Sequence, residues 1–359
     1  MNIVATELRK SLKIFGPVKS ESYQIGPHGI SAQDSDVWIV EESPLSGLGD
    51  CFSINGKKLA QVTNRMSGQI EITREEKFLT LRSAKAKIDL EIQNTKPPKL
   101  PEFSEKFHTL DLSEFKKAIA LSSASASPNK SAPFGGVVLL QSLPLGLEET
   151  SPSGYRSVGT NGNVLTVLTV STPLEFEFKS LLNLSATAVV QIMDGTRVDF
   201  GESNSHVCLR SGGVTLFASK PSQVYPNFDG LLAIPPKLKF SFKSEEWLSA
   251  LRTVEPLIDS SLDQGGITVQ FREGVVQYST VGVGSTATDE ATYEQIEPDP
   301  LFEPVTVDNL RINASYLSGF LSKAGETATI GLVNQSKPVK LESGNMMTLV
   351  MPIATKKVK

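Results

Sequence analysis

The segment 240–254, FSFKSEEWLSALRTV, joins two kinds of hydrophobic periodicity. Its first three residues alternate apolar and polar side chains, as a strand with one buried face does. Polar residues follow, and one helical stripe then contains Trp247, Ala250, Leu251 and Val254. The segment therefore predicts a strand that runs directly into a helix, with a small polar residue at the junction as the helix N-cap.

The same pattern of a strand leading into a helix recurs along the whole chain. The junctions are Phe52–Asn55, Leu110–Ser113, Phe176–Ser180, Phe240–Ser244 and Leu310–Asn313, with Ile3–Thr6 as a weaker sixth copy. Helical windows follow at 6–20, 55–66, 111–122, 179–189, 243–254 and 313–324, of which only 179–189 is poorly patterned. Strand-like alternation comes after the helices. The sequence thus predicts one strand–helix–strands unit that is used six times.

Two proline-rich segments predict where pairs of these units separate. They are 96–101 (KPPKLP) and 234–237 (IPPK). We expect an α+β protein of three similar domains, each with two helices packed on antiparallel sheets, at 1–105, 106–236 and 237–359. Loops or long hairpin tips are expected at 141–154 and 286–304, of which the second is acidic.

Composition limits the class of protein. The chain has 359 residues, of which 39% are hydrophobic and 21% charged, as in folded globular proteins rather than disordered or collagen-like chains. Cys51 and Cys208 are interpreted as reduced intracellular thiols. No apolar run approaches the ~20 residues of a membrane span, and the first 19 residues do not contain the apolar stretch of a signal peptide. A cytoplasmic location is therefore expected.

Charge is distributed unevenly between the helical windows and the rest of the chain. The six windows hold 13 basic and 5 acidic residues, whereas the remaining residues carry a net charge of −12. If equivalent helices of a repeat share one surface, that surface is basic, which suits a polyanion such as nucleic acid. The alternative is that Lys and Arg simply occupy solvated helix faces, because they are good helix formers.

Residue patterns of an active site are not found in the sequence. The three histidines are scattered, and no His or Cys pair has metal-ligand spacing. Gly56-Lys57 lacks the earlier glycine and the following Ser or Thr of a phosphate-binding loop, and no nucleophile elbow occurs. We therefore expect a protein that is not an enzyme, with no cofactor and no metal.

Six strand–helix–strands units in three domains, basic helices and the absence of catalytic patterns together resemble the bacterial DNA sliding clamp, the beta subunit of replicative DNA polymerase III. Four segments carry the resemblance in the right order: 155–165 (YRSVGTNGNVL), 220–231 (KPSQVYPNFDGL), 310–320 (LRINASYLSGF) and 349–353 (LVMPI). They span the second and third domains, and the first domain fits by length and pattern only. The resemblance implies a DNA polymerase processivity factor, a homodimeric ring around double-stranded DNA.

The sequence departs from the family pattern in three places. Asn163 and Val164 replace a His-Arg pair, and Asp229 and Gly230 stand where basic residues are usual. Six residues, Ala354–Lys359, extend past the usual end. These departures favour a divergent clamp that works with its own polymerase, and a virus-encoded clamp is one reading of them.

The charge pattern and the resemblance together imply DNA contact through the basic side of the helices. Contacts are expected to go to phosphates without sequence preference, because a clamp must slide. Lys130 lies in a loop, 125–132, that matches a DNA-reaching loop of the family. The other expected contacts are Arg9, Lys10, Lys13, Lys19, Lys57, Lys58, Arg65, Lys116, Lys117, Lys179 and Lys323.

The resemblance also implies an apolar pocket that captures short peptides from the DNA polymerase and the clamp loader. The LVMPI run is too apolar for a free tail, and methionine suits a surface that repacks for several partners. The alternative is that Val350–Ile353 is only the last core strand. The expected lining residues are Phe134, Thr160, Gly162, Asn163, Leu165, Pro226, Leu231, Val350, Met351, Pro352 and Ile353.

Three further residues are placed at the subunit interface of the ring by resemblance: Phe103 on one edge, and Leu257 and Ile258 on the other. The alternative is that they are core hydrophobes. For the whole chain, the second reading is a non-enzymatic β-rich structural or assembly protein whose repeats merely stack, and an enzyme with a dispersed site is a third. Ring closure and retention on circular DNA would separate the clamp from both.

Overall fold

A computed structural model describes residues 1–101, 106–132, 134–143, 153–258, 266–272, 274–282, 285–296 and 310–353. The chain divides into two compact units. Unit 1 contains Met1–Ala120, Leu140–Ser153 and Thr172–Ser222, and unit 2 contains Leu121–Leu139, Gly154–Ser171 and Gln223–Lys359. The division into three domains stays a prediction.

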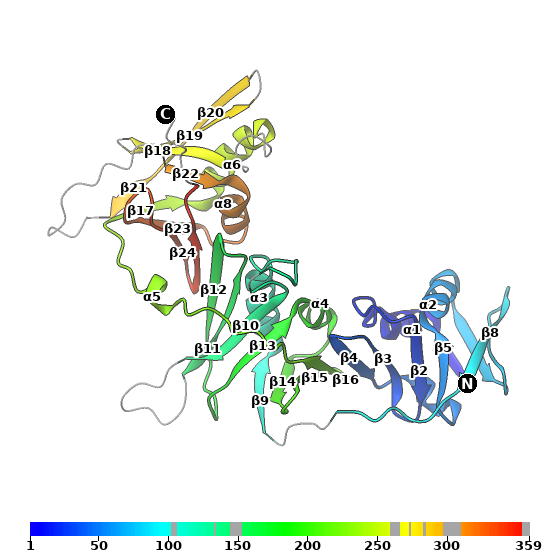
Figure 1. The fold of residues 1–359 in the computed structure, drawn as a ribbon. Helices are drawn as coiled ribbons and strands as arrows, with labels where there is room; N and C mark the ends of the chain where they lie inside the picture. The colour runs from blue at the N-terminus through cyan, green and yellow to red at the C-terminus, as the bar shows by residue number, and fades with distance from the viewer. Residues whose placement is uncertain are drawn as a thin grey trace. The chain divides into compact units, whose positions relative to one another are not determined.

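Unit 1 is built on an antiparallel sheet (Figure 1). Its strands are β1 (Asn2–Val4), β2 (Ser22–Gly26), β3 (Gly29–Gln33), β4 (Val37–Glu41), β5 (Phe52–Asn55), β6 (Gln69–Arg74), β7 (Phe78–Arg82), β8 (Lys87–Asn94), β9 (Phe107–Asp111), β14 (Arg197–Glu202), β15 (His206–Ser211) and β16 (Val214–Ser219). They follow the order β1-β6-β7-β8-β5-β2-β3-β4-β16-β15-β14-β9.

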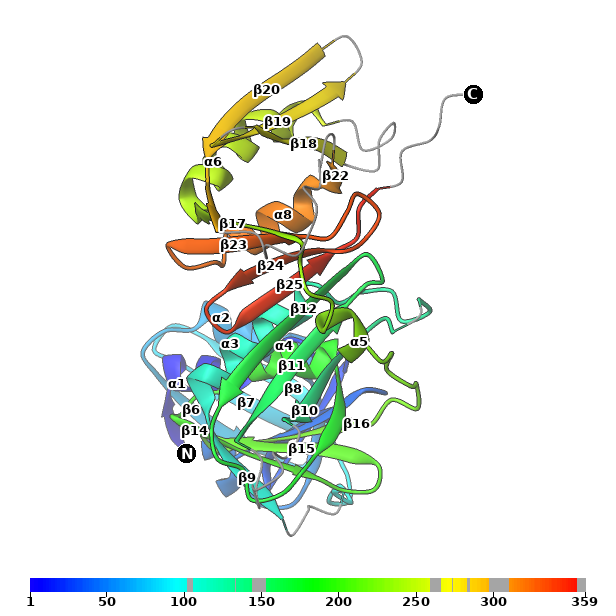
Figure 2. The ribbon, with the colours of Figure 1, turned by 90° about the vertical axis from the view of Figure 1, so that its left-hand side faces the viewer.

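Unit 2 contains two antiparallel strand arrays. Its strands are β11 (Gly154–Thr160), β12 (Val164–Ser171), β17 (Leu238–Lys243), β18 (Gly266–Arg272), β19 (Val275–Gly282), β20 (Ser285–Thr292), β21 (Glu294–Ile296), β22 (Leu310–Asn313), β23 (Thr327–Leu332), β24 (Val339–Ser343) and β25 (Met346–Val350). The first array runs β11-β12-β25-β24-β23-β17-β21, with β12, β25 and β24 side by side in Figure 2, and the second runs β20-β19-β18-β22. Of the remaining strands, β10 (Val137–Ser142) continues from unit 2 into unit 1, and β13 (Lys179–Asn183) belongs to unit 1.

Five of the six predicted strand–helix junctions are present and the remaining one lies a few residues later than predicted, so the α+β class with antiparallel sheets is confirmed. The helices at these junctions are α1 (Ala5–Lys13), α2 (Gly56–Arg65), α3 (Leu112–Ser123), α4 (Leu184–Ile192), α6 (Ser244–Val254) and α8 (Ala314–Leu321). Four of them have a side-chain cap whose oxygen lies 2.8–2.9 Å from a first-turn amide, on Asn55, Asp111, Asn183 and Asn313. The polar N-cap expected at every junction is wrong at α1 and α6, where Val4 and Lys243 make no side-chain cap.

The fourth junction was placed too early by the sequence. The strand continues over Lys179–Asn183 and the helix begins at Leu184, so a helix over 179–189 is wrong. The physical reason is that α4 is buried among neighbours on several sides, and LSATAVVQI therefore shows no amphipathic stripe. Three short helical turns complete the described structure: α5 (Asp229–Leu232), η1 (Pro44–Leu48) and η2 (Glu255–Leu257).

The prediction of a loop or a long hairpin tip at 286–304 is also wrong for the residues that the structure describes, because they form strands. Ser285–Thr292 forms β20 and Glu294–Ile296 forms β21. Threonines alternate along β20 and Ala291 is buried, as in a strand with one covered face. Of the loop predicted at 141–154, residues 144–152 lie outside the described part of the chain.

The helical stripe that contains Trp247 forms part of an aromatic core in unit 2. The Trp247 side chain is fully buried and stacks on Phe242, with the ring centroids 3.7 Å apart. Tyr278 of β19 meets it edge-on at 5.8 Å, and Trp247 Nε1 donates to the carbonyl of Thr292 at 2.9 Å. The helix is thereby fastened across β19 and β20.

Two strand pairs join successive repeats. In unit 1, β4 pairs with β16, and its first residue Val37 is the register partner of Ala218. In unit 2, β12 pairs with β25, and its first residue Val164 is the register partner of Val350. The two junctions therefore use the same strands of the repeat in the same register.

Candidate functional site

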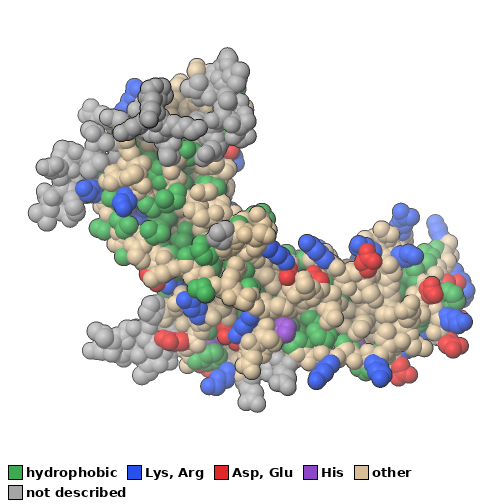
Figure 3. Space-filling view, in the orientation of Figure 1, with side chains coloured by type: hydrophobic (Ala, Val, Ile, Leu, Met, Phe, Trp, Pro, Cys, Tyr) green, Lys and Arg blue, Asp and Glu red, His purple; other side chains and the backbone are tan. Residues whose placement is uncertain are grey.

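The predicted DNA contacts lie mainly on unit 1, and most of them are on α1 and α2. Leu8, Leu12 and Leu59 bury one side of these helices, so the lysines and arginines between them face outward. Figure 3 shows Lys and Arg side chains along the side of unit 1 that carries α1 and α2, interspersed with acidic side chains and with further basic residues on the opposite side. The exposed members are Lys10, Lys13, Lys57, Lys58 and Arg65, with Arg9 half-buried.

Three of these cations gather around one carboxylate. Lys10 Nζ lies 2.8 Å from Asp194 Oδ2, in a pair whose side chains are 75% and 59% exposed. The hydrogen bond from Lys10, together with the charges of Lys10, Lys116 and Lys13, lowers the pKa of Asp194, and the same bond raises the pKa of Lys10. Lys116 Nζ also donates to the carbonyl of Met193. The positive charges of these lysines are therefore partly balanced by an acid of the same surface.

A second carboxylate lies deeper beside the same helix. Glu41, at the end of β4, accepts a hydrogen bond from Ser11 Oγ of α1. Burial raises the pKa of Glu41 to about 7, although the Ser11 bond and the charge of Lys10 act in the opposite direction. The sequence contained no signal for this group, because its burial follows from the pairing of β4 with β16.

The other predicted DNA contacts are more dispersed. Lys117 is exposed on α3, Lys19 follows α1, and Lys179 lies on β13 rather than on a helix. Neither α4 nor α8 contains a charged residue, so the basic bias belongs chiefly to α1 and α2. On unit 2, Lys130 is exposed, and burial lowers the pKa of Lys323, which lines a recess of about 80 Å³ beside α8.

The predicted pocket residues come together in unit 2, around the β11–β12 hairpin and the end of β25. Leu165 is the register partner of Leu349, and Met351 N donates to the carbonyl of Asn163 at 2.8 Å. Thr160 Oγ1 accepts from Gly162 N and donates to the carbonyl of Val164, which closes the hairpin. Phe134 reaches the same region through Tyr225, with the ring centroids 6.1 Å apart.

The predicted pocket residues differ in burial: some are buried in the core and others are accessible to solvent. Thr160, Leu165 and Val350 are buried, so they support the site and are not open to a partner. Strand β25 ends at Val350, and residues 351–353 lie beyond the strand, where Ile353 N donates to the carbonyl of Arg311 at 2.8 Å. Met351 and Leu231 are exposed at 39% and 44%, and the remaining residues, Phe134, Gly162, Asn163, Pro226, Pro352 and Ile353, are half-buried or exposed.

The structure adds apolar residues that the sequence reasoning missed. Leu231 lies at a shallow recess between α5 and the β23–β24 hairpin, whose other apolar members are Ile234, Pro236, Val333, Pro338 and Leu349. Val224, a few residues before α5, is 85% exposed. Hydrophobic side chains also gather over the part of unit 2 that holds β17, β23 and β24 in Figure 3. A cluster of exposed apolar residues is typical of an interaction surface.

The acidic departure at Asp229 is neutralised within unit 2. Arg156 Nη1 lies 2.7 Å from Asp229 Oδ1, and the guanidinium lies 4.6 Å from the centre of the Phe228 ring. The Arg156 side chain extends from β11 and is only 10% exposed, so the buried partner of this ion pair is the arginine. Asp229 therefore does not present a free negative charge beside Leu231.

Phe134 has the backbone torsion φ 63°, in the left-handed region that non-glycine residues rarely adopt. Such a conformation costs of order 1–3 kcal/mol and persists where surrounding structure imposes it. Here the ring contacts Tyr225, whose hydroxyl donates to the carbonyl of Val158 at 3.0 Å. Burial raises the pKa of Tyr225 well above its usual range, so it stays a donor.

Of the three predicted interface residues, Phe103 lies outside the described residues. Leu257 ends η2 and is 38% exposed, and Ile258 beside it is half-buried. Neither a helix fit to span a membrane nor a group of three or more His, Cys, Asp or Glu placed to hold a metal occurs within the described ranges. The extension Ala354–Lys359 is not part of those ranges.

No protein-family model and no curated protein sequence matches this chain. Solved structures match it over its whole length. The DNA polymerase III subunit beta from Pseudomonas aeruginosa is 15% identical with a TM-score of 0.84, and that from Thermotoga maritima is 15% identical with a TM-score of 0.83. A sliding clamp from Bartonella birtlesii, bound to griselimycin, is 14% identical with a TM-score of 0.84. Each match covers 99% of both chains.

These matches agree with the six junctions and the antiparallel sheets described above, and they confirm the resemblance at the level of the fold. Over its full length this chain has the fold of the bacterial DNA sliding clamps, the beta subunits of DNA polymerase III.

Proposed function

We propose that this chain is a DNA sliding clamp. Two copies form a ring around duplex DNA, and the ring tethers a DNA polymerase without catalysing a reaction itself. The observation that carries the proposal is the full-length agreement in fold with DNA polymerase III beta subunits, at 99% coverage of both chains. ATP use belongs to a separate clamp loader. The clamp contributes effective concentration, because a tethered polymerase stays near the primer end after each dissociation.

Two strand edges support closure of the ring. Residues 87–91 of β8 pair with β7 on one side only, and β20 pairs with β19 on one side only, within the described ranges. Unpaired edges favour addition of another strand. Leu90 is equivalent in position to Ala218 and Val350 of the internal junctions. Each of these three residues lies four positions after the residue that closes its hairpin turn, and the closing residues are Ala86, Val214 and Met346.

The two internal junctions then give the register between copies. At these junctions the first residue of β4, Val37, pairs with Ala218, and the first residue of β12, Val164, pairs with Val350. The first residue of β20 is Ser285, and the residue equivalent to Ala218 and Val350 is Leu90. Ser285 of one copy therefore faces Leu90 of the other, and Thr286 faces Asp89. Leu257 and Ile258 lie near the same edge, since η2 packs against β20, and Phe103 completes the proposed interface from the other copy.

Cysteine crosslinking tests this register. The double variant Asp89→Cys/Thr286→Cys is expected to form a covalent dimer on mild oxidation, because opposed residues of antiparallel strands lie about 5.5 Å apart, within disulfide range. Both positions are exposed in the single chain, and the native Cys51 and Cys208 are buried. Non-reducing electrophoresis and solution mass measure the product.

The matched control moves one cysteine by a single residue. In Asp89→Cys/Ala287→Cys the second side chain points to the opposite face of the strand, so crosslinking is expected to fail. Equal crosslinking of both double variants would contradict the register. A monomer at micromolar concentration, both with and without nicked circular DNA, would contradict the ring and favour the stacked structural protein.

DNA contact is assigned to the exposed cations of α1 and α2, with Arg9, Lys10, Lys13, Lys57, Lys58 and Arg65 foremost. Removal of two phosphate contacts by Lys57→Ala/Lys58→Ala is expected to lower the slope of log affinity against log salt by about 1.8. The Glu21 partner of Lys57 lies 3.7 Å away in a largely exposed pair, so its loss has little structural cost. Fluorescence anisotropy with unrelated duplexes over a salt series measures the slope.

The control for this prediction carries the same charge change on hairpin residues outside α1 and α2. Lys77→Ala/Lys85→Ala removes two exposed lysines of the β6–β8 hairpins. We expect a smaller change in slope there. Equal slopes for the two double variants, or a base-specific footprint, would contradict DNA contact through the helices.

A further inference from the structure

A recess of about 80 Å³ lies in unit 2, where α8 and the end of α3 meet the paired strands β12 and β25. Thr166 of β12 and Thr348 of β25 line it from the sheet, and Ser125 lines it from the segment that follows α3. Tyr316 of α8 and Lys323, just beyond that helix, complete its polar lining. Its polar side chains therefore carry hydroxyl groups and one ammonium group, and none of its described residues is acidic.

This recess lies on the opposite face of the sheet from the recess beside α5. Successive side chains of a strand point to opposite faces. Thr348 lines the recess beside α8, whereas the next residue, Leu349, lines the recess beside α5. Leu165, the register partner of Leu349, precedes Thr166 in the same way. The recess beside α8 is therefore separate from the apolar surface that contains Leu231.

Three hydroxyl groups form a chain of hydrogen bonds at this recess. Ser125 Oγ lies 2.7 Å from Thr166 Oγ1, which lies 3.0 Å from Thr348 Oγ1. Three hydroxyl groups contain three hydrogens, and the two bonds use two of them. The third hydrogen has no acceptor among the described residues. Because Thr166 and Thr348 are only 5% and 3% exposed, the available acceptor is a group inside the recess.

Lys323 adds a positive charge to the same recess without an acidic partner. Loss of hydration lowers the pKa of its ammonium group, and no carboxylate acts in the opposite direction. Tyr316 Oη accepts from Asn161 Nδ2 at 3.1 Å, so the hydroxyl hydrogen of Tyr316 is also left to donate. The charge and the surplus donors together favour an anion, since an anion accepts hydrogen bonds and balances the ammonium group.

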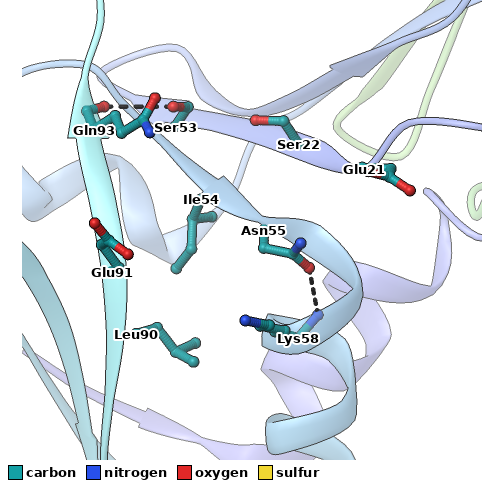
Figure 4. A pocket seen from close by; sticks show the side chains of 9 residues that line it. All are labelled: Glu21, Ser22, Ser53, Ile54, Asn55, Lys58, Leu90, Glu91 and Gln93. Atoms are coloured by element: carbon teal, nitrogen blue, oxygen red, sulfur yellow. Dashed lines mark hydrogen bonds between the residues drawn. The ribbon is translucent and has the colours of Figure 1, made fainter.

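The largest cavity described in unit 1 is different in its charges. It has a volume of about 370 Å³ and lies beside the first turn of α2 (Figure 4). Two carboxylates, Glu21 and Glu91, line it together with Lys58, and Asn55 is already occupied as the N-cap of α2. Such a mixed lining favours neither an anion nor a cation. The absence of acidic residues among the described lining therefore distinguishes the recess beside α8.

We propose that the recess beside α8 binds one phosphate group, which accepts the surplus hydrogen of the Ser125–Thr166–Thr348 chain and takes the Lys323 ammonium group as its counter-charge. The volume equals that of two or three waters, which leaves room for a single tetrahedral oxyanion and none for a whole nucleotide. Water alone would accept the hydrogen but would leave the ammonium group unbalanced. Free phosphate and the DNA backbone both supply this chemistry, and the site does not depend on the proposed ring.

Calorimetric titration of the full chain with inorganic phosphate, at constant ionic strength in a chloride buffer, tests the site. We expect one site per chain. Lys323→Met removes the charge and keeps an unbranched side chain, and it is expected to raise the dissociation constant about tenfold or more. Lys337→Met, at an exposed lysine of the β23–β24 hairpin, is the matched control and is expected to leave the constant unchanged.

A second variant tests the hydroxyl chain. Thr166→Val/Thr348→Val removes both buried hydroxyl groups from register partners of the sheet, where valine is well accommodated. The same rise of about tenfold or more is expected, with Thr169→Val, on the other face of β12, as the control. Thermal unfolding without phosphate establishes that each variant is folded. No saturable phosphate binding by the unaltered chain, or equal weakening by Lys323→Met and Lys337→Met, would overturn the site.

Anisotropy with duplex DNA distinguishes the two sources of phosphate. If the DNA backbone occupies the recess, Lys323→Met weakens duplex binding more than Lys337→Met does, and inorganic phosphate competes with the duplex. If free phosphate is the ligand, the two variants bind the duplex equally, and only Lys323→Met loses phosphate binding. A chain that binds phosphate here but neither dimerises nor binds DNA keeps this site and loses the clamp. A DNA-binding ring without saturable phosphate binding does the reverse.

Discussion

Replacing both Met351 and Pro352 by alanine is expected to abolish stimulation of a DNA polymerase that the unaltered chain stimulates, while DNA binding persists. Met351 is 39% exposed and lies beyond the end of β25, so its side chain is available to a partner and adds little to the core. Loss of a central apolar contact costs about 2 kcal/mol in a typical interface, or roughly 30-fold in affinity. Processive primer extension on circular DNA measures the effect.

The design of this variant follows from the burial of β25. Truncation after Thr348 would also remove Leu349 and Val350, which are buried, and would disturb the pairing with β12. Truncation after Val350 avoids this. Ile296→Ala, at a residue exposed to 42%, is the control for a general loss of exposed apolar surface. Undiminished stimulation by a folded, ring-forming Met351→Ala/Pro352→Ala variant would place the partner pocket elsewhere.

Glu41→Gln is expected to stabilise the chain at pH 8 by up to ~3 kcal/mol relative to the unaltered protein. Burial raises the folded-state pKa of Glu41 from 4.5 to about 7, so the folded chain binds this proton more tightly than the unfolded chain does. The stabilisation from that proton is complete below pH 4.5 and is lost as pH rises through 7. A glutamine is neutral throughout and can still accept the bond from Ser11.

The measurement is denaturant unfolding of both proteins at several pH values. The difference in unfolding free energy is expected to be small near pH 4.5 and to reach its maximum above pH 7. Glu42→Gln, at the exposed neighbouring residue, is expected to change stability by no more than about 0.5 kcal/mol at either pH. A difference between Glu41→Gln and the unaltered chain that does not vary with pH would contradict the buried, protonated state of Glu41.

The candidate pocket was only partly visible in the sequence. The LVMPI run was found because apolar residues near a charged end are conspicuous, and Leu231 was included because segment 220–231 resembles the clamp family. Ile234 and Val333 were missed, since each is an ordinary apolar residue until the β23–β24 hairpin is set beside α5. The Arg156–Asp229 pair, 73 positions apart, could not be anticipated either, and it changes the charge that a partner would meet.

Local patterns determined the repeating unit of this protein from sequence alone. Alternation with period two, a helical stripe and a polar cap at the junction act within about fifteen residues, and five of the six junctions they predicted are present where expected. The start of helix α4 was predicted wrongly because a helix that is covered on several sides has no amphipathic stripe to detect. The fold class was therefore readable, and the misplaced junction belongs to the one helix whose surroundings come from distant strands.

Only the tertiary structure decided how repeats are joined. The amides of Ser219 and Met351 make the same contact at two junctions, although the two side chains have nothing in common. A backbone hydrogen bond places almost no demand on residue type, so it leaves no signature in the sequence. The burial that raises the pKa of Glu41 arises in the same way, from the pairing of β4 with a strand more than 170 residues later.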